Sequence, residues 1–113
     1  MTDSLREEIH FLLAQLCRAI ADASRVLILY TLMDGPISVS DLAKDIGLSQ
    51  PSVSRHLRVL RESGLTSAER IGHSKMYRLA DERVVEALDL LRSILIDNFE
   101  NKGKLARTSS EST

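Results

Sequence analysis

The sequence predicts a mainly α-helical fold that carries one small β-hairpin. Apolar residues recur at spacings of three and four over most of the chain, which is the period of an amphipathic helix. Serine, glycine and proline stand between these segments, at positions where helices typically begin and end. From residue 65 to residue 79 the pattern changes to that of two short strands around a Gly72-His73-Ser74 turn.

Two helices are expected at the start of the chain. The first runs from about Ser4 to Ala19, because its apolar residues share one stripe: Leu5, Ile9, Leu12, Leu13, Leu16 and Ile20. Asp22 or Ser24 is expected to cap the second helix. Asp34-Gly35-Pro36 ends it, since glycine suits the left-handed cap and proline cannot continue a helix.

Two shorter helices follow an extended piece at residues 37–39. Ser40 is expected to cap the first, which ends before Gly47, and Ser49 the second, which runs to about Glu62. Two helices joined by a tight turn that contains glycine form a helix-turn-helix. The strands at 65–71 and 75–79 then form a hairpin beside it, known in such folds as a wing.

A last helix is expected from Asp81. Its apolar stripe is wider than one small core needs: Val84, Ala87, Leu88, Leu90, Leu91, Ile94, Leu95, Ile96 and Phe99. Residues 101–113 are rich in Lys, Ser and Thr without periodicity, which is typical of a disordered tail. We therefore expect one winged helix-turn-helix domain over residues 1–100, with its DNA-binding core at about 34–80.

The charge is distributed unevenly, although the net charge of the 113-residue chain is only −1. The segment from Lys44 to Arg78 contains seven basic and three acidic residues, a net charge of +4. The remainder of the chain carries −5. A basic patch on an acidic body is what a DNA-contacting surface requires.

Composition and motifs also indicate where the protein is located in the cell and which classes of protein can be excluded. The single cysteine excludes an intrachain disulfide and suits a reducing cytosol. The N-terminus has no signal-peptide pattern, and no apolar run is long enough to cross a bilayer, so we expect a soluble cytoplasmic protein with no membrane partner. No phosphate-binding glycine loop or nucleophile elbow is present, which argues against an enzyme.

Several segments together resemble the ArsR/SmtB-type family of winged helix-turn-helix repressors. They are residues 16–25, 39–43, 48–57 and 60–65 and the wing from Arg70 to Leu79. The resemblance implies a homodimer built from the first and last helices and an operator with two-fold symmetry. It also implies, in many members, a metal or other effector that releases the DNA.

The candidate DNA-binding residues come from the second helix of the helix-turn-helix and from the wing. A helix in the major groove contacts bases with its N-terminal residues, and hydroxyl, amide and guanidinium groups can read base edges. The candidates are Ser49, Gln50, Ser52, Ser54, Arg55 and His56 on the helix, and Arg70 and Lys75 on the wing. The alternative is a winged-helix protein-interaction module that does not bind DNA specifically.

The sequence argues against a high-affinity transition-metal site and indicates no cofactor. Where the family resemblance places a Cys-Val-Cys metal site, this chain has Ser38-Val39-Ser40, and hydroxyls are poor ligands for soft metals. From Asp81 to Glu100 there is no histidine for the family's other metal site. Cys17 is expected to be a small buried residue, with a thiol sensor as the alternative. A small-molecule or thiol-reactive effector stays open.

Overall fold

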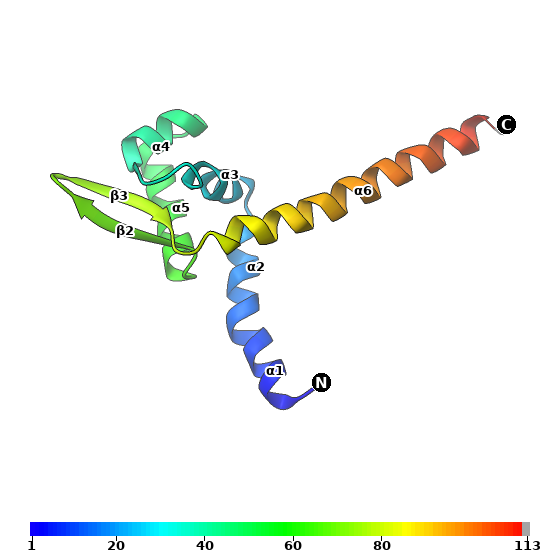
Figure 1. Cartoon of the computed structure of the whole chain (residues 1–113), viewed down its shortest axis with the longest axis horizontal. Helices are drawn as coiled ribbons and strands as arrows, with labels where there is room; N and C mark the ends of the chain where they lie inside the picture. Colours follow the sequence, from blue (N-terminus) through cyan, green and yellow to red (C-terminus); the bar gives the residue numbers. More distant parts are fainter. Residues whose placement is uncertain (112–113) are drawn as a thin grey trace. The chain divides into compact units, whose positions relative to one another are not determined.

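The structure is a computed structural model that describes the backbone of residues 1–111 and the side chains of residues 1–103. The chain falls into two compact units, one over Met1–Glu82 and one from Arg83 onward. The elements of the first unit, most of them labelled in Figure 1, are α1 (Asp3–Glu8), η1 (Ile9–Leu13), α2 (Ala14–Ile20), α3 (Ala23–Leu32), β1 (Ile37–Ser38), α4 (Val39–Ile46), α5 (Gln50–Glu62), β2 (Thr66–Ile71) and β3 (Ser74–Leu79). The second unit is the single helix α6 (Arg83–Glu111).

The first predicted helix is present as three consecutive helical segments, α1, η1 and α2, and η1 is a π-helical turn between the two α-helical parts. Thr2 caps the segment, since its Oγ1 accepts a hydrogen bond from the N–H of Leu5 at 3.2 Å. Within α1, η1 and α2 only Ala19 is buried. The apolar stripe is therefore largely exposed in the single chain, with Phe11 70% and Leu12 61% exposed.

The core of the first unit is formed by α3, α4 and α5. Its fully buried large side chains are Ile28, Leu29, Leu42, Val53, Leu57 and Leu60. The predicted cap of α3 is confirmed at Asp22, whose carboxylate accepts a hydrogen bond from the N–H of Ser24 at 2.8 Å. The predicted cap of α5 is confirmed at Ser49, whose Oγ accepts a hydrogen bond from the N–H of Ser52 at 3.3 Å.

The prediction that Ser40 caps α4 is wrong. Ser38 is the cap, and its Oγ accepts a hydrogen bond from the N–H of Asp41 at 3.2 Å. Ile37 and Ser38 pair with β3, and this pairing keeps Ser38 in the extended conformation that an N-cap needs. Gly47 ends α4 in the left-handed conformation, at φ 73°, as the sequence predicts.

The strands form a three-stranded antiparallel sheet in the order β1-β3-β2. The predicted hairpin is confirmed, but Ser74 belongs to β3 and pairs with Ile71, so the connection is the two residues Gly72 and His73. Gly72 has a φ of 64°, which a two-residue hairpin turn requires at its first central position. The short strand β1 connects the start of the helix-turn-helix to the wing.

The last helix begins at Arg83, two residues later than expected, and continues to Glu111. The backbone of residues 101–111 is thus helical where the sequence predicts a disordered tail. Lys, Leu, Ala and Arg between residues 102 and 107 are strong helix formers, even though this stretch has no apolar periodicity. The end of the predicted tail, residues 112–113, lies outside the described residues. Over the described part of the chain, no helix is long and apolar enough to cross a membrane.

Candidate nucleic-acid interface

The first turn of α5 presents a group of polar side chains. Gln50, Ser54 and Arg55 are exposed, while Ser52 is half-buried. The Oγ of Ser52 lies 3.0 Å from the Oγ of Ser49 and accepts a hydrogen bond from the guanidinium of Arg55 at 3.2 Å. These contacts hold Arg55 beside the helix N-terminus, where the free backbone N–H groups attract anions.

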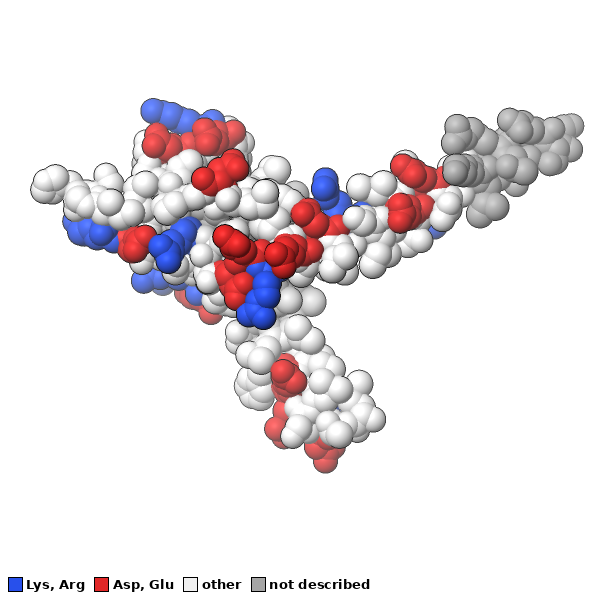
Figure 2. Space-filling model, in the orientation of Figure 1, with Lys and Arg blue, Asp and Glu red and all other residues white. Residues whose placement is uncertain are grey.

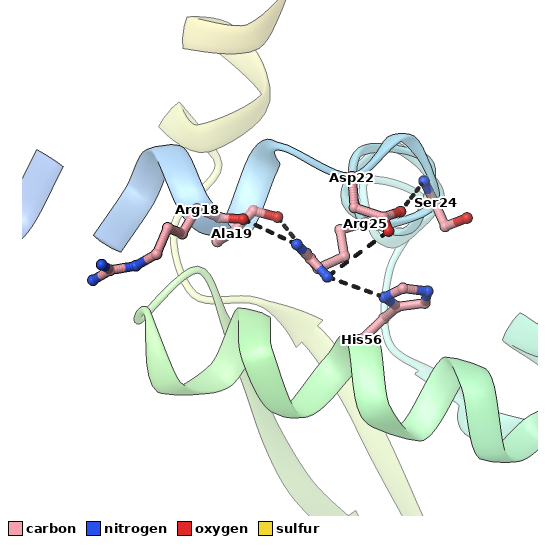
Figure 3. Close-up of polar contacts among 6 residues, drawn as sticks. All are labelled: Arg18, Ala19, Asp22, Ser24, Arg25 and His56. Atoms are coloured by element: carbon pink, nitrogen blue, oxygen red, sulfur yellow. Dashed lines mark hydrogen bonds and ion pairs between the residues drawn. The ribbon is translucent and has the colours of Figure 1, made fainter. Parts of the chain in front are cut away.

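His56, the sixth candidate on α5, has a different environment. It is half-buried, and its Nδ1 lies 3.4 Å from Nη1 of Arg25 on α3 (Figure 3). One of its two ring nitrogens is therefore engaged within the protein. This side of α5 also carries Val59 and Ser63, which line a hollow of about 360 Å³ together with Arg18 and Arg25.

The two wing candidates share one face of the hairpin. Arg70 and Lys75 are direct partners in the β2–β3 register, and both are exposed. The Nζ of Lys75 lies 5.5 Å from the ring centroid of the half-buried Tyr77, a cation–π geometry. Arg78 lies on the opposite face, because side chains alternate along a strand, and pairs there with Glu69 at 3.0 Å.

A groove between α5 and β3 contains two arginines that the sequence analysis does not assign to the site. Arg58 and Arg61 line it together with Leu57, Lys75 and Tyr77, around about 320 Å³ of space. Arg55, Arg58 and Arg61 follow each other at intervals of three, which places them along adjoining faces of one helix. That spacing is the signal that could have identified them.

Basic side chains gather where these candidates lie. On the face that Figure 2 presents, Lys and Arg side chains lie over the hairpin region of the first unit, with an acidic side chain among them. This agrees with the excess of positive charge between Lys44 and Arg78. The structure brings Ser54 of α5 and Lys75 of the wing together, since both line one hollow of about 260 Å³.

Cys17 on α2 is exposed in the single chain, whereas the sequence predicts a small buried residue. It stands two residues before the buried Ala19, and two residues are about 200° apart around a helix, so the two side chains point in nearly opposite directions. Among the described residues, no group of three or more His, Cys, Asp or Glu side chains is arranged to hold a metal ion.

The consecutive helices α4 and α5, followed by the β2–β3 hairpin with its basic groove, define a winged helix-turn-helix protein. The family model described as bacterial regulatory protein, arsR family, matches residues 22–67. The chain is 38% identical to the HTH-type transcriptional regulator KmtR of Mycobacterium tuberculosis over 89% of this chain and 75% of that protein. It therefore belongs to the arsR family, whose members are transcriptional regulators and not enzymes.

Further relatives and a solved structure agree with this assignment. The chain is 46% identical to the regulator NmtR of M. tuberculosis over 67% of this chain, but spans only 63% of that protein. It is 33% identical to the biofilm growth-associated repressor of Xylella fastidiosa over 72% of this chain and 71% of that protein. The homodimeric winged helix-turn-helix DNA-binding domain of a Mycobacterium bovis protein superposes with a TM-score of 0.78 at 27% identity, covering 89% of this chain and 93% of that domain.

Proposed function

We propose that this protein is a homodimeric transcriptional repressor that binds a DNA operator with two-fold symmetry. The observation that carries the proposal is that Ser54, in the polar first part of α5, lines one hollow with Lys75 of the exposed cation pair on the wing. The X. fastidiosa relative is named a repressor, and the M. bovis domain is a homodimer that binds DNA. Both descriptions support the same activity here.

In this proposal α5 lies in the major groove with its N-terminal turn toward the bases. Gln50 is the main base-reading candidate, since its amide can bond two edge atoms of adenine, a contact worth about 1–3 kcal/mol in discrimination. Ser49, Ser52 and Ser54 supply hydroxyls at the same end of the helix, and Arg55 contacts a base or a phosphate. Arg70 and Lys75 contact the DNA backbone or the adjacent minor groove.

The proposed dimer is built from the α1–α2 segment and α6. Both carry large apolar side chains that a single chain leaves in water: Leu5, Phe11, Leu12 and Leu13 on the first, and Leu90, Leu91, Ile94, Leu95, Ile96 and Phe99 on the second. Burying apolar surface is worth about 25 cal/mol per Å². A second copy of the chain is the partner that two-fold operator symmetry requires.

The effector is proposed to be something other than a tightly bound transition metal. Ser38 and Ser40 offer hydroxyls in place of thiolates, and the part of α6 before residue 104 contains no histidine. A small-molecule or thiol-reactive effector is the proposed class, and the exposed thiol of Cys17 is its one candidate cysteine. We place the protein in the cytoplasm, where its DNA target would be found.

The test is fluorescence anisotropy with the DNA upstream of the protein's own gene, measured over a series of salt concentrations. Specific binding by a dimer is expected, with random DNA of equal length bound at least about a thousandfold more weakly. The Gln50→Ala variant should lose discrimination at one base position in each half-site. Equal affinity for upstream and random DNA would favour the alternative, a protein-interaction module.

A further inference from the structure

The side chain of Arg25 joins three helices in the first unit. Arg25 belongs to α3, and its side chain is only 16% exposed. Its Nε donates a hydrogen bond to the carbonyl oxygen of Ala19 at 2.5 Å, and its Nη2 donates one to that of Arg18 at 2.9 Å. Both carbonyls belong to the last turn of α2, and that of Arg18 also accepts a hydrogen bond from the N–H of Ala21 at 3.4 Å.

The remaining guanidinium nitrogen of Arg25 contacts α5. Its Nη1 lies 3.4 Å from Nδ1 of His56, which is 31 positions further along the chain, and 4.0 Å from a carboxylate oxygen of Asp22 (Figure 3). Arg25 therefore connects the end of α2 to the helix that carries the candidate base-reading residues. The contact with His56 is long but involves a charged donor, and such contacts are stronger than neutral ones.

The chemistry of this contact determines which nitrogen of His56 carries the proton. A guanidinium has five N–H donors and no acceptor, so the His56 nitrogen that faces it must present a lone pair. Neutral His56 then carries its proton on Nε2. Once Nδ1 is engaged by Arg25, Nε2–H is the only ring group free to contact another molecule, and it can only donate.

We propose that Arg25 is a positioning residue for operator recognition, which fixes His56 as a neutral donor toward a phosphate oxygen of the DNA. This inference rests on the proposed function. A phosphate is the expected acceptor because His56 lies on the side of α5 that faces α3, whereas Gln50 and Ser54 are exposed. The flanks of a helix in the major groove face the phosphate walls, and its central face meets the bases.

The same contacts connect operator binding with the segment proposed for dimerisation. The carbonyls that hold Arg25 close the continuous helical segment formed by α1, η1 and α2. A displacement of that segment moves two of the four groups that contact the guanidinium, and hence moves the partner of His56. Arg25 thus has hydrogen bonds to both α2 and α5.

The first experiment needs no DNA. Long-range ¹H–¹⁵N spectra distinguish the two neutral tautomers of each imidazole. We expect His56 to be held in the Nε2–H form in the unmodified protein, and to become a mixture in Arg25→Lys, because one ammonium cannot reach both carbonyls and His56 together. The exposed His10 and His73 serve as internal references, and His56→Gln identifies the signal. An Nδ1–H tautomer, or no change in Arg25→Lys, would overturn the proposal.

The second experiment measures operator affinity in matched variants. Arg25→Lys and His56→Phe should each weaken binding about tenfold, a loss of about 1.4 kcal/mol, and the double variant should be no weaker than either, because both remove one coupled interaction. His56→Gln should bind within about threefold of the parent, since its amide also accepts and donates hydrogen bonds. Thermal unfolding of each variant identifies those that fail to fold.

The possible results separate this inference from the proposed function. Additive losses in the double variant, or full affinity in His56→Phe, would contradict the positioning role while the parent still binds its operator. If the parent binds no operator, the proposed function fails. The tautomer measurement on the free protein then still decides whether Arg25 fixes His56.

Discussion

Arg70 and Lys75 lie directly opposite each other across the β2–β3 ladder, on the same face of the hairpin. Two like charges in this position oppose strand pairing, because their side chains are close neighbours on one face. The pair therefore costs stability in the free protein, and a polyanion alongside the wing would relieve the repulsion.

Replacing Arg70 with alanine should weaken binding to all DNA sequences by a similar factor. One lost phosphate contact should reduce the slope of log affinity against log salt by about 0.9. The free energy of unfolding should stay equal or rise slightly, because the repulsion with Lys75 is removed. Anisotropy over a salt series and urea unfolding measure the two effects.

Arg78→Ala is the matched control for the wing. Arg78 is on the opposite face of the hairpin and is already paired with Glu69. Its loss should leave the salt slope unchanged and cost at most about 1 kcal/mol of stability. If Arg78→Ala reduced the slope and Arg70→Ala did not, the other face of the wing would be the one that meets DNA.

Ser38→Ala should lower the free energy of unfolding by about 1 kcal/mol, the usual value of a side-chain N-cap. The Oγ of Ser38 is the group that accepts the hydrogen bond from the N–H of Asp41. Ser40→Ala, two positions further on and inside α4, should change stability by less than about 0.5 kcal/mol. Urea unfolding of the two variants is the measurement. A larger loss of unfolding free energy in Ser40→Ala than in Ser38→Ala would show that Ser40 is the N-cap of α4, as the sequence alone indicates.

The case of Ser38 and Ser40 shows what local patterns can and cannot decide. Periodicity and glycine positions predicted α3, α4, α5 and the hairpin, because each depends on residues within a few positions of one another. The choice between two serines depends on the pairing of Ile37 with Tyr77, which lies 40 positions away. A pairing over that distance leaves no local signal.

The candidate site likewise has parts that local sequence patterns predict and parts that depend on contacts between distant segments. The polar first turn of α5 and the opposed wing pair could be listed from residue types and strand alternation. The contact of His56 with Arg25, and the place of Arg58 and Arg61 in a groove with Lys75, arise only when segments distant in sequence pack together. These are the parts of the site that the sequence analysis missed or assigned to a simpler role.

Asp22 should make the stability of the protein depend on pH in the acid range. Its carboxylate accepts the N–H of Ser24, and this hydrogen bond, helped by the charge of Arg25 and opposed by desolvation, lowers the pKa of Asp22 below its usual 3.8. The carboxyl group of Asp22 binds its proton less tightly in the folded state than in the unfolded state. The ionised carboxylate therefore adds to the free energy of unfolding. This contribution is fully present above the usual pKa and is lost as the pH falls through the lowered value.

Urea unfolding of Asp22→Asn tests this dependence, since asparagine is also a good N-cap but cannot ionise. The variant should be less stable than the parent at about pH 7, and the difference should shrink towards zero at about pH 2. A difference that stays constant over this range would show that ionisation of Asp22 contributes nothing to folding.

The last prediction concerns assembly. Leu91 and Leu95 on α6 are 53% and 66% exposed in the single chain, and their spacing of four places them on one stripe of the helix. If a second copy covers this stripe, a carboxylate there would be buried without a partner, which costs far more than the lost apolar contact. Leu91→Asp and Leu95→Asp should each shift a micromolar dimer towards monomer and lower operator affinity, because a monomer reaches only one half-site.

Ser93→Asp, an exposed polar position between them, is the control for helix propensity and added charge, and it should remain dimeric. Light scattering gives the mass of each variant and circular dichroism its helix content. A monomeric parent protein would contradict the proposed dimer, and dimeric forms of both leucine variants would place its interface elsewhere.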